Sequence, residues 1–458
     1  MPRARNESGN TTGASGQPHL RSVALVALGC SKNMVDAEMI LGSLLEDGWA
    51  LTGSQSEADM VVVNTCGFIE SAREESVQAI VEALEGRRQG QKVVVAGCLP
   101  QKAGKELLAE LPEIDAILGI NAPRDVKSAA RSLFAGDEVS CNGVTPAERT
   151  YGESQPRFLL TPRHHAYLRI ADGCDRGCRF CAIPRIRGRQ RSRTLGELVK
   201  EATLLAQGGC RELGLVAHDL NAWGTDLQDG NRLEHLLPAL ASVEGIEWIR
   251  LFYLYPAGMG PALIKAMATT PRVLPYIDMP LQHISDHMLS VMNRRITKRE
   301  TLDLLGALRE AMPHAVFRTT LLVGHPGETK ADVEELKEFM ASWRFQHLGA
   351  FGYSPEEGTA AFHMEGRVAP KEVQRRVDEV MKLQQKIAFE LQSARVGTQD
   401  EVVVDEGQGS AFLARSWREA PDSDSVIKVK AKNLKIGQTI QVKIDGRTGY
   451  DLVAAPLQ

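Results

Sequence analysis

Three cysteines in one short segment have the spacing of a metal-binding loop. Cys174, Cys178 and Cys181 stand in the order Cys-x-x-x-Cys-x-x-Cys, just past a short apolar run. Three thiolates in a tight loop can bind three irons of a [4Fe-4S] cluster, and the usual fourth cysteine is absent from the loop. Zinc is the alternative, but zinc sites usually close with four ligands from paired Cys-x-x-Cys units, and the chain has no second pair. We therefore expect a cluster with one open iron.

An open iron gives such a loop a defined chemistry. On a low-potential cluster it can chelate S-adenosylmethionine and pass it an electron, which breaks the carbon–sulfur bond and releases a 5'-deoxyadenosyl radical. The spacing resembles that of the radical S-adenosylmethionine enzymes.

A second set of three cysteines follows three predicted strands. Cys30, Cys66 and Cys98 each lie in a turn shortly after an apolar run. These runs occupy residues 23–28, 60–63 and 93–96 and alternate with helical stretches that begin at about residues 35 and 70. The alternation predicts a parallel α/β sheet, in which the carboxyl ends of the strands share one edge. Buried free cysteines are common as small apolar residues, but three in register with three strands favour a second [4Fe-4S] cluster with an open iron.

The rest of the chain predicts a barrel followed by a small β domain. Strand candidates separated by helical stretches lie at residues 166–170, 212–217, 248–254, 276–279, 315–322 and 347–352. They indicate a partial (β/α)6 barrel whose first strand leads into the 174–181 loop, so this loop is expected at the barrel mouth. A charged helix over about residues 370–395 is interpreted as a connector. Period-two alternation at 401–404, 426–429 and 439–444 then predicts a small β-barrel.

Length and composition set the expected domain organisation. The 458 residues suggest roughly three domains. We expect a disordered tail at 1–19, an α/β domain at 20–134, a linker at 135–162, a barrel at 163–385 and a β-barrel with a lead-in helix at 386–458. A formal charge of -4 argues against a general polyanion binder. No apolar run approaches the roughly 20 residues of a membrane span, and the cysteines fit a reducing compartment, so a cytoplasmic protein is expected.

Longer motifs resemble those of the radical S-adenosylmethionine methylthiotransferases over nearly the whole chain. They occupy residues 29–38, 64–67, 97–98, 172–184 and 323–328. The resemblance implies an amino-terminal cluster domain, a radical barrel and a carboxyl-terminal TRAM β-barrel. One branch of this family modifies an adenosine in transfer RNA, and the other modifies an aspartate of small-subunit ribosomal protein number twelve. Residues 181–188, 275–283 and 351–359 look like the ribosomal branch.

The charge of the predicted TRAM module supports the ribosomal branch. A module that grips RNA should be basic, whereas residues 395–458 hold nine Lys/Arg and nine Asp/Glu. Methylthiolation of transfer RNA is the alternative within the family. A non-catalytic iron–sulfur carrier and a zinc-stabilised RNA-binding module are alternatives of other classes. One departure from the ribosomal branch is residues 217–221, where a Ser-Gln-Asp-Thr stretch is usual, so His218 takes no role by analogy.

The resemblance implies the following chemistry. Cys174, Cys178 and Cys181 would hold the radical cluster, and the released radical would abstract a hydrogen from the target aspartate. The other three cysteines would hold an auxiliary cluster that transfers the methylthio group, with a second S-adenosylmethionine as methyl donor. The product would be 3-methylthioaspartate. An electron donor such as flavodoxin or ferredoxin is implied, nucleic acid and membranes are not required, and we expect a monomer because no strong heptad seam is evident.

Other cofactor contacts and charged residues have weaker signals. Phe180 lies between two ligands and would pack near the adenine or simply in the core. Val323 and Gly324, at the end of a strand, could let the cofactor approach the backbone. The five arginines between residues 185 and 193 would share one side if extended, and would form a solvated rim or bind a carboxylate. Asn33, Asp36 and Glu38 follow Cys30 at a helix start and are expected to be structural.

Overall fold

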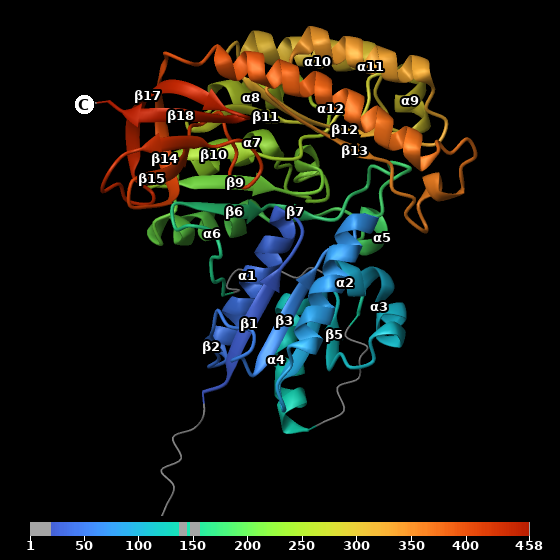
Figure 1. The fold of residues 1–458 in the computed structure, drawn as a ribbon, viewed down its shortest axis with the longest axis vertical. Coiled ribbons are helices and arrows are strands. Elements are labelled where there is room, and N and C mark those ends of the chain that lie inside the picture. The colour runs from blue at the N-terminus through green and yellow to red at the C-terminus, as the bar shows by residue number, and fades with distance from the viewer. Residues whose placement is uncertain (1–19, 137–143, 147–155, 458) are drawn as a thin grey trace, which may run out of the picture.

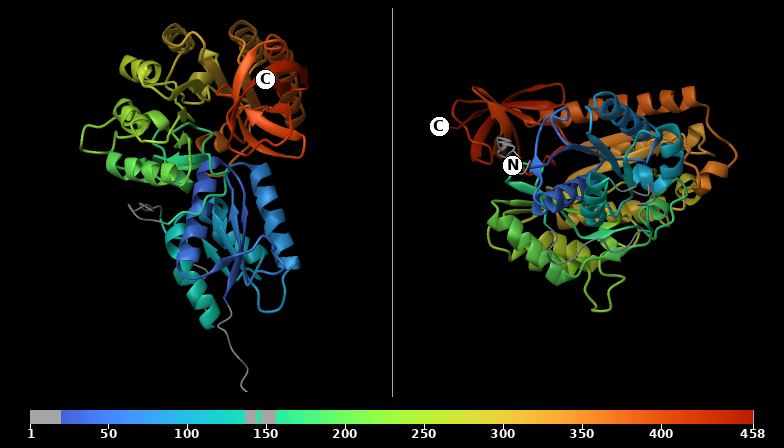
Figure 2. Two further views of the ribbon diagram at one scale, coloured as in Figure 1. Left: turned by 90° about the vertical axis from the view of Figure 1, so that its left-hand side faces the viewer. Right: turned by 90° about the horizontal axis from the view of Figure 1, so that it is seen from below.

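The computed structural model describes residues 20–136, 144–146 and 156–457. An α/β domain packs against one side of a larger α/β half-barrel, and a small β-barrel follows at the carboxyl end (Figures 1 and 2). The expected tail at 1–19 and most of the expected linker at 135–162 lie outside the described residues. None of the described helices has the length and apolar character needed to cross a membrane.

The first domain is a five-stranded parallel sheet with strand order β2-β1-β3-β4-β5. Its strands are β1 (Ser22–Ala27), β2 (Ala50–Leu51), β3 (Met60–Thr65), β4 (Lys92–Gly97) and β5 (Ala116–Leu118). Its helices are α1 (Ser31–Glu46), α2 (Glu70–Glu85), α3 (Cys98–Glu110) and α4 (Ala122–Ala135). The central strands are runs of valine that are buried on both faces, as helices on both sides of a parallel sheet require.

The second domain is an open, all-parallel sheet with order β13-β12-β11-β10-β9-β6. Its strands are β6 (His165–Arg169), β9 (Glu212–Val216), β10 (Trp248–Leu251), β11 (Val273–Asp278), β12 (Val316–Val323) and β13 (His347–Gly352). The covering helices are α6 (Leu195–Gln207), α7 (Leu233–Ala241), α8 (Pro261–Thr269), α9 (Asp286–Val291), α10 (Lys298–Ala311) and α11 (Lys330–Trp343). All six strands lie at the runs that the sequence predicts, and the expected partial (β/α)6 barrel is confirmed.

The long helix α12 (Pro370–Ser393) does more than connect two domains. Val380 and Ile387 belong to the core of the second domain, and Gln384 Nε2 donates to the Phe345 carbonyl at 2.9 Å. The helix therefore covers β13 as a barrel helix before it leads into the last domain (Figure 1). The boundary expected between residues 385 and 386 falls inside this continuous helix.

The last domain is a closed five-stranded barrel with order β14-β15-β16-β18-β17. Its strands are β14 (Gln399–Gln408), β15 (Ala411–Arg415), β16 (Ile427–Lys430), β17 (Thr439–Thr448) and β18 (Asp451–Pro456). The alternation in the sequence identified three of them. It missed β15 and β18, which are short and rich in alanine, and whose partners are set by the closing of the barrel rather than by a local pattern.

The concave face of the half-barrel is filled by the other two domains. Tyr167, Phe252 and Tyr276 point into this face, where Met39 of α1 packs against them. Ala420, from the loop between β15 and β16, joins the same cluster. The first helix of the chain is thus seated in the barrel, and this places the residues at its start beside the barrel strands.

Candidate functional site

Cys30, Cys66 and Cys98 lie at one edge of the first sheet, as the sequence predicts. Cys30 is the residue before α1, Cys66 directly follows β3, and Cys98 begins α3 after β4. The loops are in close contact, since a Cβ at Gly29 would lie 2.9 Å from Cys66 Cβ and 3.3 Å from its Sγ. Cysteines that are more than 30 residues apart in sequence therefore converge because strands of a parallel sheet end together.

The charge around these thiols differs from one to the next. Burial raises the pKa of Cys98 to about 12, although Arg187 Nη2 donates to its Sγ at 3.2 Å. Burial also raises the pKa of Cys66. At Cys30 the raising effect of burial is outweighed by Lys32, two backbone N–H donors and Arg187, and the pKa is lowered. An iron cluster binds cysteines as thiolates, so its binding would release the protons that Cys66 and Cys98 hold.

A substitution at Gly29 tests the close approach of these loops. We expect Gly29→Ala to lower the iron bound at this site severalfold while the protein stays folded, because the new Cβ would press on Cys66. Gly48→Ala is the matched control. It has a similar positive φ, 86° against 96°, but nothing lies within 4 Å of the new Cβ. Both variants carry the same backbone strain of about 1 kcal/mol, so equal iron content in the two would contradict the account. Iron analysis of the reconstituted proteins makes the comparison.

Cys174, Cys178 and Cys181 lie on the loop that leaves β6 and the short strand β7 (Ala171–Asp172). The base of this loop is closed by β8 (Arg191–Ser192), which pairs with β7. Cys178 Sγ lies 3.7 Å from Tyr255 Oη and 3.4 Å from Arg294 Nη1, and both of these side chains come from segments that follow barrel strands. Burial raises the pKa of Cys174 to about 11 and that of Cys181 to about 12. The loop is at the barrel mouth, as expected.

Both triads suit a cluster better than a zinc ion. Thiolates on one zinc lie only about 3.8 Å apart, because each Zn–S bond is about 2.3 Å. Among the residues that the structure describes, neither cysteine triad is gathered within 4.8 Å. On a cluster each thiolate binds a different iron, which calls for wider spacing. Among the described residues each site offers three thiols and no fourth, a ligand set that would suit a [4Fe-4S] cluster with an open iron.

The two triads face each other across the junction of the domains. Cys98 packs with Ile120 of the first domain and with Ala182 and Ile186 of the barrel domain. Ala182 directly follows Cys181, and Ile186 ends the short helix α5 (Ile183–Ile186). A ligand of one predicted cluster thus packs in the same apolar cluster as the residue that follows a ligand of the other.

The other predicted cofactor contacts have mixed placements. The ring of Phe180 stands edge-on to His325, with centroids 6.3 Å apart. Val323 is fully buried at the end of β12. The N–H of Gly324 donates to Glu328 at 2.8 Å, and a Cβ there would lie 2.5 Å from the side chain of Val373. Gly324 is therefore explained by the close approach of α12, and its contact with a cofactor stays a prediction.

The arginine run is not extended. Arg185 lies in α5 (residues 183–186), Gly188 has a φ of 74° and Arg191 lies in a strand, so the five arginines are not in one extended segment. Arg187 is 1% exposed and donates to Asp36 at 2.7 Å, and Arg193 is buried and forms an ion pair with Glu201 at 2.5 Å. Arg189 is exposed. Arg187 and Arg193 are thus already paired with carboxylates of the chain itself, so neither is available to bind the carboxylate of a ligand as the sequence suggested.

A buried charge network at the junction could not be seen in the sequence. Asp36 accepts from Arg187 at 2.7 Å and from Arg169 at 2.6 Å, and Arg187 also reaches Asp172 at 3.5 Å. Asp36 and its neighbour Glu38 are indeed structural, but they bind distant arginines instead of capping α1. The pairs are more than 100 residues apart, and no local pattern marks them. His218 lies 3.4 Å from Asp172, and burial keeps the pKa of this histidine well below its usual value.

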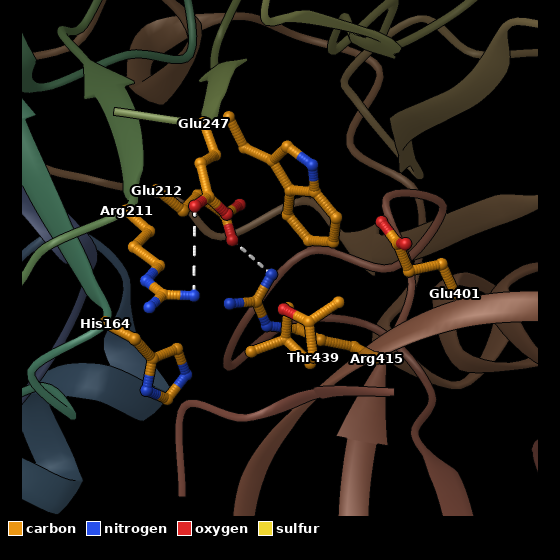
Figure 3. Close-up of a pocket in the computed structure, with 9 residues that line it drawn as sticks. His164, Arg211, Glu212, Glu247, Glu401, Arg415 and Thr439 are labelled. Atoms are coloured by element: carbon orange, nitrogen blue, oxygen red, sulfur yellow. Dashed lines mark hydrogen bonds and ion pairs between the residues drawn. The ribbon is translucent and has the colours of Figure 1, made fainter. Parts of the chain in front are cut away.

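A small pocket lies at the opposite, amino-terminal end of the barrel strands, where the last domain is seated (Figure 3). Glu212, at the start of β9, is joined to Arg415 of β15 at the centre of this pocket. Arg250 donates to the same carboxylate at 2.8 Å. Beside it, His164 Nε2 lies 2.7 Å from Asp405, and Arg415 is 3.0 Å from this carboxylate. His164, His165 and Asp405 are close enough for a metal ion, but Asp405 is already paired with a buried guanidinium. The pocket is a junction of ion pairs.

We expect Glu212→Gln to lower the free energy of unfolding by about 3–5 kcal/mol, because buried Arg250 would lose its carboxylate partner and buried Arg415 would keep only Asp405. Burial raises the pKa of Glu212, but Arg415 and Arg250 outweigh this effect and hold it at about 2. The group therefore stabilises the fold fully above its ordinary value of 4.5, and the stabilisation is lost as the pH falls toward 2.

Denaturant unfolding of the cluster-free protein at several pH values measures this difference. Glu247→Gln is the control. Glu247 lines the same pocket, but its side chain is 58% exposed and its ion pair with Arg211 is long, at 3.8 Å. Its cost should stay below about 1 kcal/mol. Equal costs for the two variants would contradict a buried network.

Comparison with known proteins gives three matching family models. Residues 22–119 match the model described as uncharacterized protein family UPF0004, residues 168–340 the radical SAM superfamily, and residues 396–457 the TRAM domain. The described β-barrel and half-barrel agree with the last two. The solved radical S-adenosylmethionine methyltransferase TsrM from Kitasatospora setae is similar in fold, with a TM-score of 0.54 over 85% of this chain and 79% of that one, at 15% identity.

Curated relatives match over nearly the whole length. The ribosomal protein uS12 methylthiotransferase RimO of Anaeromyxobacter sp. (strain K) is 44% identical over 94% of this chain and 92% of its own length. The protein of the same name from Clostridioides difficile (strain 630) is 39% identical over 94% of this chain and 98% of its own.

Proposed function

Because this chain belongs to the RimO family of ribosomal protein uS12 methylthiotransferases, we propose that it attaches a methylthio group to one aspartate of uS12, giving 3-methylthioaspartate. It is a radical S-adenosylmethionine enzyme of mixed α/β fold. The observation that supports the reaction best is the packing of Cys98 in one apolar cluster with Ala182 and Ile186, because Ala182 directly follows Cys181.

The six cysteines fit two [4Fe-4S] clusters. When bound, the radical cluster supplies the electron that cleaves S-adenosylmethionine, and the auxiliary cluster supplies the sulfur. Cys174, Cys178 and Cys181 would hold the first, and Cys30, Cys66 and Cys98 the second.

The chain's own residues position these ligands. Arg187 holds Cys98 by a charged hydrogen bond, and Arg294 does the same for Cys178. Cys98 is only 9% exposed and is covered by apolar side chains from both domains. Hydrogen abstraction from carbon needs no acid or base, so the proposal assigns no acid or base residue.

The partners follow from the same chemistry. We propose a small electron carrier such as flavodoxin or ferredoxin as reductant, a cytoplasmic location and a monomeric enzyme. Nucleic acid is not needed for this reaction, and the balanced charge of residues 395–458 supports a protein substrate over transfer RNA.

The test is an anaerobic reaction of the reconstituted enzyme with a reductant, S-adenosylmethionine and uS12, followed by mass spectrometry of peptides. A methylthio mass gain on one aspartate is expected. Formation of 5'-deoxyadenosine without a change in the peptide would point to transfer RNA, which is tried in a parallel reaction. If neither product forms, the chain acts as an iron–sulfur carrier and the proposal fails.

A further inference from the structure

Lys32 is a buried cation at the junction that has no carboxylate partner in the part of the chain that the structure describes. The residue is 5% exposed, and its Nζ lies 3.2 Å from the centre of the Tyr253 ring. Burying an ammonium group without a counter-charge is costly, and a cation–π contact offsets only part of that cost. Such an unmatched group is expected where an anion from outside will bind.

The position of Lys32 is what the reaction would require. Lys32 lies two residues after Cys30, in the first turn of α1, beside the proposed auxiliary cluster. Tyr253 follows β10 at the carboxyl end of the barrel, the same end from which the radical loop leaves β6. The ammonium therefore lies near Cys30 and at the carboxyl end of the barrel strands.

The tyrosine under this ammonium is held firmly. Its φ of 62° is a conformation that bulky residues rarely adopt. The N–H of Tyr253 donates to Asp278 at 3.0 Å, and Arg318 donates to the same carboxylate at 2.9 Å. Backbone strain of this kind persists where the surroundings enforce it, and it is frequent in active sites. The platform that orients Lys32 is thus built into the barrel.

Three arginines of the junction are paired with carboxylates of the chain itself. Arg169 and Arg187 both pair with Asp36, and Arg193 pairs with Glu201. The proposed reaction places sulfur on the carbon next to the carboxylate of the target aspartate. A cation that holds this carboxylate therefore fixes the reacting carbon one bond away and rejects an adenosine, which has no carboxylate.

From this geometry, and resting on the proposed function, we propose that Lys32 binds the side-chain carboxylate of the target aspartate and so selects the substrate. Lys32 acts as a specificity-determining residue, distinct from the cysteines that hold the clusters.

The experiment is a double-mutant cycle between enzyme and substrate. Binding of two uS12 peptides, one with the target aspartate and one with asparagine in its place, is measured anaerobically with the reconstituted wild-type enzyme and with Lys32→Met. The wild type should bind the aspartate peptide roughly tenfold or more tightly than the asparagine peptide, and Lys32→Met should lose this preference. Lys32→Arg, which keeps the charge, should keep most of the preference.

Lys127→Met is the control, since Lys127 of α4 pairs with Glu46 at the end of α1 and is not beside Cys30 in the sequence. The assignment is overturned if Lys32→Met keeps the full preference for aspartate. It is also overturned if the variant only shifts the electron paramagnetic resonance spectrum of the auxiliary cluster, because Lys32 would then merely balance the charge of that cluster. A wild-type enzyme that leaves the aspartate peptide unmodified overturns the proposed function instead.

Discussion

A Cys66→Ala variant is expected to produce 5'-deoxyadenosine from S-adenosylmethionine but to lose at least about a hundredfold in methylthiolation. Loss of a neighbour that merely supports a metal ligand typically costs 10- to 100-fold, and loss of the ligand should cost more. Cys66 lies on the first domain, whereas the loop that would activate S-adenosylmethionine lies on the barrel. The two activities should therefore separate. Both products are measured in the same anaerobic reaction by chromatography and mass spectrometry.

Two further variants complete this test. Cys181→Ala should lose both products, because it removes a ligand of the radical cluster. Cys210→Ala should keep both, since Cys210 is a buried thiol in the barrel core that donates to the Glu212 carbonyl, away from either triad. If Cys66→Ala keeps full methylthiolation, Cys66 is not a ligand of the auxiliary cluster.

The second large effect is expected for Arg187→Met. Arg187 is fully buried and serves Asp36, Asp172 and Cys98 together. Without it, the buried carboxylates of Asp36 and Asp172 lose one of their positive partners, so we expect the free energy of unfolding to fall by about 3–5 kcal/mol. The Cys98 thiolate also loses its charged donor, so the electron paramagnetic resonance spectrum of the auxiliary cluster should change. Denaturant unfolding and spectroscopy of the reconstituted protein measure the two effects separately.

Arg189→Met is the control for this variant. Arg189 is in the same run, but its side chain is 91% exposed and its ion pair with Asp175 is long, at 3.6 Å. Its cost should be under about 1 kcal/mol, with an unchanged spectrum. A spectrum that is the same in Arg187→Met and wild type would show that Arg187 serves only the packing of the domains.

The fold could be predicted to a large extent because its signals are local. The six barrel strands are apolar runs that end at glycine or polar turns, and the three cysteines of the first domain follow strand ends. The role of α12 could not be predicted. Its mean hydropathy is low and its charged residues suggest a solvated connector, but a narrow stripe through Val380, Gln384 and Ile387 packs on the barrel.

The site could be predicted only for residues whose spacing carries chemistry. The cysteine triads can be recognised in the sequence because their number and spacing match a set of cluster ligands. A buried ion pair such as Asp36 and Arg187 has no recognisable sequence pattern, because its two residues are 151 positions apart. The prediction that the five arginines share one side was wrong. Their alternation suggested an extended segment, whereas Pro184 and its neighbours form the helix α5. Lys32 stands inside a motif that the sequence shows plainly, yet its burial becomes visible only when the barrel covers α1.

Two separate clusters are the central claim, and iron analysis with electron paramagnetic resonance tests it most directly. The wild-type protein, reconstituted without oxygen, should contain about eight irons per chain. A variant with Cys174, Cys178 and Cys181 all changed to alanine should keep about four, and its spectrum should no longer respond to S-adenosylmethionine. About four irons in the wild type, or none in the triple variant, would contradict the account.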